Sequence, residues 1–124
     1  MNPELIADLG DLSDKYLGSW NMPNNKLTEL KFGRSSRSHP NTNYTKYYNS
    51  LLTNLNIGTT TPYLRYLNIA RCIGLISLDV SNCNKLEEID AEGANNLTSI
   101  TFPSDSILKK LYLPKSLTNI VIDN

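Results

Sequence analysis

The side chains best suited to acid–base or metal chemistry are a short acidic cluster and one histidine. The acidic cluster contains Glu87, Glu88 and Asp90. Alternate residues of an extended strand point to opposite faces, so Glu87 and Asp90 would diverge and could not act as the paired acids of a glycoside hydrolase. No Cys-x-x-Cys or His-x-x-x-His spacing is present, and His39 has no second metal ligand near it in the chain. The sequence therefore predicts no metal site.

A basic, tyrosine-rich segment, residues 33–50, is the best candidate for binding a ligand. It reads GRSSRSHPNTNYTKYYNS and contains no acidic residue, and its Gly, Pro, Asn and Ser content predicts a loop. Arg, Lys and Tyr side chains together can contact phosphate, sugar or a pocket on a protein. A surface loop whose tyrosines pack back against the fold would have the same composition, so both interpretations stay open. The candidate binding residues are Arg34, Arg37, His39, Tyr44, Lys46, Tyr47 and Tyr48.

The composition is that of one ordinary folded domain of 124 residues. Twelve basic and twelve acidic residues cancel, so net charge does not favour nucleic acid or an acidic membrane as a partner. No apolar run is long enough to span a membrane, and the first residues lack the features of a secretory signal. These observations favour a protein partner or a neighbouring domain or subunit.

A repeating unit of eleven residues organises most of the chain. Each unit has apolar residues at its first, fourth and sixth positions. The fourth and sixth side chains of an extended segment point the same way, and the polar residues at positions two, three and five include the outward ones. Stacked units would share one continuous core. Units begin at Leu17, Leu27, Leu52, Leu64, Leu75, Leu86, Leu97, Leu108 and Leu117.

Two units are expected to form each coil of the fold. Eleven residues at about 3.3 Å each make a loop only about 36 Å around, which leaves little room inside for Leu and Ile. A coil of 22 residues has that room and brings units two apart onto the same side. The sequence thus predicts a mostly β solenoid of short parallel strands in a single domain, 1–124. Residues 1–16 form an N-terminal helix, or a cap made of a degenerate first unit, and residues 33–51 form a loop insertion.

The pattern Leu-x-x-Leu-x-Leu-x-x-Asn/Cys resembles the leucine-rich-repeat family, and Cys72 and Cys83 occupy its ninth position. The resemblance implies a right-handed superhelix with a ladder of strands on its concave side, in which the ninth residue satisfies backbone groups of the turn. Leu75 follows Cys72 by three residues rather than two, as in the 21–22-residue repeats of Bacteroidota surface proteins. Segments 78–83 and 111–117 also resemble repeats in tail-associated proteins of phages that infect gut Bacteroidota.

The resemblance also bears on the two cysteines. Ninth-position thiols are expected to be buried in turns, where they are inert, so neither is expected to form a nucleophilic pair with His39. Cys72 and Cys83 belong to adjacent units on opposite arms of the coil, which argues against a disulfide between them. No phosphate-binding glycine motif is present either. We therefore expect no catalytic residue and no cofactor, and the chain is not expected to be an enzyme.

The stacking predicts an outward ladder of side chains in which Arg65 lies beside Glu87, and Glu87 beside Lys109. Such a ladder serves either as a contact face for a partner or as an ordinary solvated surface that helps to fix the strand register. The opposite side, with Ser and Thr, is nearly uncharged and also suits packing against another domain. The candidate contacts of the ladder are Arg65, Tyr66, Glu87, Glu88, Lys109, Lys110 and Tyr112.

These features predict a non-catalytic protein-interaction or structural module that displays side chains from a rigid ladder. The resemblance implies a phage tail-associated or bacterial surface protein, and so a location on the virion or the cell surface. An alternative is a module that binds glycan or nucleic acid through residues 33–50. Because the last unit reaches Ile122 without a polar cap, we expect the chain to be part of a larger protein, or to self-associate through this C-terminal edge.

Overall fold

The computed structural model describes residues 6–8, 18–20, 26–35, 50, 52–55, 57, 62–103, 107–117 and 119–122. Within these residues the chain forms ten short strands and no helix. The strands are β1 (Ile6–Asp8), β2 (Gly18–Trp20), β3 (Glu29–Lys31), β4 (Leu52–Leu55), β5 (Tyr66–Asn68), β6 (Ser77–Asp79), β7 (Glu88–Asp90), β8 (Ser99–Phe102), β9 (Lys110–Tyr112) and β10 (Asn119–Ile122). The described part of the chain is therefore rich in β structure.

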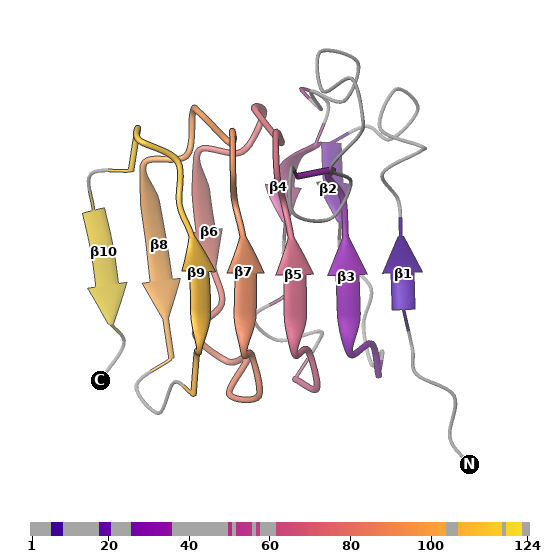
Figure 1. The fold of residues 1–124 in the computed structure, drawn as a ribbon. Helices are drawn as coiled ribbons and strands as arrows, with labels where there is room; N and C mark the ends of the chain where they lie inside the picture. The colour runs from indigo at the N-terminus through magenta and orange to yellow at the C-terminus, as the bar shows by residue number, and fades with distance from the viewer. Residues whose placement is uncertain are drawn as a thin grey trace.

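Alternate strands belong to different sheets, and every strand pair is parallel. The odd-numbered strands form one sheet in the order β1-β3-β5-β7-β9, and the even-numbered strands form a three-stranded sheet, β10-β8-β6, and a pair, β2-β4. Figure 1 shows the odd strands as a front layer running upward and the even strands behind them running downward. Because the chain advances from right to left as it passes up in front and down behind, it winds in the right-handed sense (Figure 1).

The strand register follows the repeat. Tyr66 pairs with Glu88, and Glu88 with Lys110, so equivalent positions of units two apart lie side by side. In the other layer Ser77 pairs with Ser99, and Ser99 with Asn119. The predicted alternation of units between two sides is therefore confirmed.

The core lies between the two layers and is built from the predicted inward positions. The fourth residues Leu67, Leu78, Ile89 and Ile100 are buried. They are flanked by first- and sixth-position residues that are buried as well. Leu111 is half-buried and packs against the same cluster. Each fully buried Leu or Ile contributes about 1.5–3 kcal/mol relative to an exposed one, and no three-residue strand could bury its apolar side chains alone.

The ninth position closes a turn that recurs along the chain. Its backbone N–H donates to the carbonyl of the sixth residue, and its own carbonyl accepts from the first residue of the next unit. The thiol of Cys83 also donates to the carbonyl of Ile57 at 3.6 Å. The backbone bond from the ninth to the sixth residue joins Cys72 to Ile69 at 3.1 Å, Cys83 to Val80 at 2.9 Å, and Ala94 to Ala91 at 3.1 Å.

The helix predicted within residues 1–16 is wrong at Ile6–Asp8. These residues form β1, which pairs in parallel with Glu29–Lys31, so the alternative of a degenerate first unit is the one observed there. Apolar residues three apart suit one face of a helix and also the first and fourth positions of the repeat. Pairing with the edge of β3 favours the strand over the helix, because it provides hydrogen-bond partners for the backbone N–H and C=O groups of the segment. The rest of 1–16 lies outside the described residues.

The 33–51 insertion leaves the sheet at a glycine that the packing requires. A Cβ atom on Gly33 would lie 1.9 Å from the carbonyl oxygen of Ala70 on the neighbouring strand segment. No other residue has room there, because both groups belong to backbone that is held in the ladder. Arg34, Ser35 and Ser50 are the other described residues of the insertion.

Candidate functional site

An ion-paired row crosses the odd-numbered sheet immediately before strands β5, β7 and β9. The carboxylate of Glu87 accepts from Nε of Arg65 at 2.7 Å and lies 3.4 Å from Nζ of Lys109. These hydrogen bonds hold the pKa of Glu87 below its usual value, with the two positive charges acting in the same direction. Because all three side chains reach solvent, the row orders the surface more than it stabilises the fold.

A second row runs beside the first and centres on an aromatic ring. Tyr66 pairs in register with Glu29 on one side and Glu88 on the other. The ammonium of Lys31 lies 5.8 Å from the centre of the Tyr66 ring and 3.5 Å from the carboxylate of Glu29. Burial raises the pKa of Tyr66 to about 12, and the nearby carboxylates raise it as well, against the hydrogen bond from Asn68, which lowers it. The phenol therefore stays neutral and is unsuited to acid–base catalysis near neutral pH.

The two rows border an open hollow of about 280 Å³ on the sheet surface. Its walls combine charges of both signs with one aromatic ring. This combination suits recognition of a polar surface by fixed partners, and not the enclosure of a small apolar molecule. The hollow is lined by Thr28, Glu29, Arg65, Tyr66, Glu87 and Glu88.

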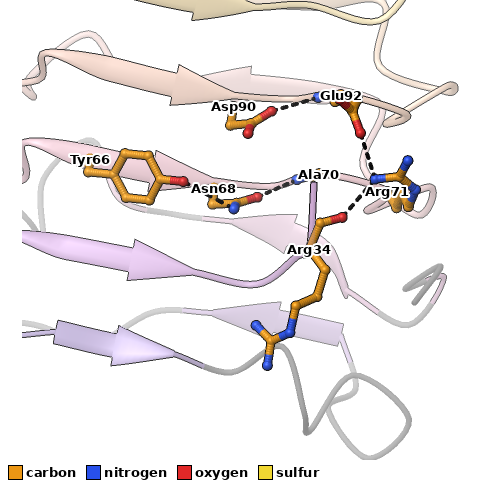
Figure 2. Close-up of polar contacts among 7 residues, drawn as sticks. All are labelled: Arg34, Tyr66, Asn68, Ala70, Arg71, Asp90 and Glu92. Atoms are coloured by element: carbon orange, nitrogen blue, oxygen red, sulfur yellow. Dashed lines mark hydrogen bonds and ion pairs between the residues drawn. The ribbon is translucent and has the colours of Figure 1, made fainter. Parts of the chain in front are cut away.

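Beyond the rows, the last residues of β5 and β7 are buried and polar. Asn68 and Asp90, both at the fifth position of their units, have almost no exposed surface. Oδ1 of Asn68 accepts from the backbone N–H of Ala70 at 2.9 Å, and Oδ1 of Asp90 accepts from that of Glu92 at 3.2 Å (Figure 2). These side chains end the strands by capping the following turn. Their role is therefore structural.

One arginine joins neighbouring coils next to these caps. Arg71 has a left-handed backbone, with a φ of 60°, and its Nη1 donates to the carbonyl of Arg34 at 2.7 Å. The same nitrogen lies 2.9 Å from the carboxylate of Glu92 (Figure 2). Arg71 thus links the start of the insertion to the strand segment that follows β7.

Sequence reasoning missed both the buried caps and this bridge. A signal for the caps is present, because Asn68, Asp79 and Asp90 recur at the fifth position eleven residues apart. Asp79 caps in the same way, with Oδ1 accepting from the backbone N–H of Ser81 at 2.9 Å. The bridge has no such signal, because it depends on one residue with a positive φ and on a carbonyl far away in the sequence.

The structure brings together most of the predicted strand-face residues. Tyr66, Glu88 and Lys110 share one register row, and Tyr112 pairs with Asp90 in the next outward row, where it is half-buried. That these side chains contact a partner remains a prediction.

Of the residues predicted to form a binding loop, the structure describes only Arg34. Arg34 is only 5% exposed, and its role in binding stays a prediction. Its backbone carbonyl accepts a hydrogen bond from Arg71. Arg37, His39, Tyr44, Lys46, Tyr47 and Tyr48 lie outside the described residues, and their binding role stays a prediction.

Both cysteines are free thiols and both are buried. Burial raises the pKa of Cys72 to about 12, so its thiolate, the reactive form, is scarce at neutral pH. Among the described residues no cluster of three or more His, Cys, Asp or Glu side chains could hold a metal ion. The same residues include no helix of the length and hydropathy needed to cross a bilayer.

The described part of the chain is a strand-rich fold of parallel strands, in which β5, β7 and β9 pair at a spacing of 22 residues. No protein-family model, no curated protein and no solved structure matches the chain.

Proposed function

We propose that the chain is a leucine-rich-repeat solenoid that acts as a non-catalytic protein-interaction module. The solenoid is supported by the two-unit register, the right-handed winding and the turn that recurs at the ninth position. A right-handed superhelix of 22-residue coils accounts for these three features together. It also explains why each coil can bury its side chains only against its neighbours.

The proposed contact surface is the outward face of the odd-numbered sheet. The observation that carries this assignment is Glu87, which is held from both sides by Arg65 and Lys109 where β5, β7 and β9 begin. Side chains held in fixed positions lose less conformational entropy when a partner binds. The hollow next to this row adds Tyr66, and Tyr and Arg are enriched among the residues that dominate binding energy at protein interfaces.

Selection from a displayed library of random peptides tests this surface, with Glu88→Lys as the test variant. Ser77→Lys is a matched control, because both residues are the third of their units but lie in opposite layers. We expect binders selected on the native chain to lose about tenfold in affinity on Glu88→Lys and to change less than about twofold on Ser77→Lys. Binders that tolerate Glu88→Lys, or a selection that enriches none, would overturn the proposal.

We further propose that the parent is a phage tail-associated protein or, second, a bacterial surface protein, in which the module serves interaction or structure. Residues 78–83 and 111–117 support this proposal through their resemblance to such repeats. Sequencing the flanking reading frame tests it. Repeats that continue into virion-like domains would support a tail protein, and a signal peptide with a cell-wall anchor would support a surface protein. A flanking sequence with neither feature would refute both assignments.

A further inference from the structure

A line of side chains lies just before the units of the odd-numbered layer, where its strands begin. Tyr63, Lys85 and Ile107 each precede the first leucine of a unit, so they are spaced 22 residues apart like the residues of the ladder. Tyr63 is 53% exposed and Ile107 is 49% exposed, and both are large apolar side chains. Exposed apolar residues that gather at one place commonly mark an interaction site.

These three residues border a hollow of about 240 Å³, separate from the one between the ladder rows. The hollow lies next to the ion-paired row and shares Arg65 and Glu87 with it. It therefore offers apolar walls from Tyr63 and Ile107 beside a charged rim. Its full lining is Thr28, Tyr63, Arg65, Lys85, Glu87 and Ile107.

The rim of this hollow is positive. Arg65 and Lys85 carry two positive charges against the single carboxylate of Glu87, which is already bound by Arg65 and by Lys109 from outside the hollow. Lys85 is exposed and makes no ion pair or hydrogen bond with the part of the chain that the structure describes. Its ammonium is thus available to a negative group on a partner, and the charge of the rim favours acidic partners over basic ones.

We propose that this hollow is the anchor site for an aromatic or large aliphatic side chain of a partner protein, flanked in the partner by a carboxylate. The apolar side chain would cover Tyr63 and Ile107, and the carboxylate would pair with Lys85. This inference rests on the proposed function as an interaction module and specifies the chemistry of its partner. Anchors of this kind, buried at the centre with polar groups around them, commonly dominate protein interfaces.

Three capped pentapeptides serve as probes: phenylalanine between two glutamates, phenylalanine between two lysines, and alanine between two glutamates. Binding is followed by methyl NMR, with Ile107 reporting on the hollow and Ile76, which is 64% exposed, on a surface outside it. We expect the glutamate–phenylalanine peptide to shift the Ile107 signal and to bind about fivefold more tightly than either other peptide. Ile107→Ser should weaken its binding by about fivefold, whereas Ile76→Ser should leave it within about twofold.

Lys85→Gln supplies a second, independent readout. It should abolish the preference for glutamate over lysine while the Ile107 signal still shifts, and thermal melts of each variant check that the fold is retained. Equal affinity for the acidic and basic peptides, an Ile76 shift as large as that of Ile107, or an unchanged affinity of Ile107→Ser would overturn the inference. If displayed peptides depend on Glu88 but these pentapeptides leave Ile107 unmoved, only this inference fails. If no displayed peptide depends on Glu88, the proposed function fails.

Discussion

Shortening Ile89 to alanine tests the shared core directly. Ile89 is fully buried on strand β7, and it pairs in register with Leu67 on one side and Leu111 on the other. A large-to-small change at such a site costs about 2–5 kcal/mol, because neighbours on both sides cannot collapse into the cavity. We expect Ile89→Ala to cost about 3 kcal/mol or more.

Leu111→Ala is the matched control. Leu111 has the same position in its unit and belongs to the next strand of the sheet, but it is only half-buried. Its truncation should therefore cost about half as much as that of Ile89, since less apolar surface returns to water. Folded domains are stable by only about 5–15 kcal/mol, so Ile89→Val, expected to cost about 0.5–1.5 kcal/mol, keeps the comparison measurable if Ile89→Ala unfolds.

Equilibrium unfolding in urea measures these differences, and calorimetry checks them. One kcal/mol corresponds to a fall in Tm of about 3–6 °C for a domain of this size, so Ile89→Ala should melt roughly 10–15 °C below the native chain. A Leu111→Ala variant that loses as much stability as Ile89→Ala would refute the reasoning, because burial between neighbouring strands would then not set the cost.

Three further changes probe the surface, a thiol and the backbone. Because the folded pKa of Glu87 is lowered, its stabilising effect is present above its unfolded pKa of about 4.3 and is lost as pH falls through the folded value. In acid titrations Glu87→Gln should thus lose stability less steeply than the native chain below about pH 4.5, and an equal slope would contradict the pairing with Arg65. Cys72 should resist a thiol reagent at pH 8 in the folded chain and react on unfolding, whereas rapid labelling of the folded chain would contradict its burial. Gly33→Ala should destabilise the chain by about 1–3 kcal/mol or more in urea, because its Cβ would overlap the carbonyl of Ala70, and an unchanged midpoint would contradict that close approach.

The sequence predicts the strand positions and their stacking because both follow from simple periods. Alternation within a strand separates inward from outward side chains, and pairing of units two apart brings Arg65, Glu87 and Lys109 together. Both periods can be read without knowledge of the turns. The resulting row is observed at the predicted residues, with Glu87 at its centre.

Features that depend on contacts between coils could not be read in this way. Asn68 and Asp90 occupy outward positions, yet both are buried, and each accepts a hydrogen bond from the backbone N–H two residues later. Ile6–Asp8 fits a helix as well as a strand by spacing alone, and only pairing with β3 distinguishes the two. The Tyr63–Ile107 hollow likewise requires residues that are far apart in the sequence to stand side by side.

Neighbour-only packing has a consequence for how a partner could be recognised. Each strand of the odd-numbered sheet pairs only with the strands beside it. A substitution on one coil therefore alters the packing of the adjacent coils and not of the whole face. Glu87 connects three successive coils at the surface, because it binds one cation on each neighbour. Removing Arg65 alone would leave Glu87 held by Lys109 and turned toward β9. The position of this carboxylate, and with it the shape of both hollows that Glu87 lines, therefore depends on the identity of residues on three successive coils.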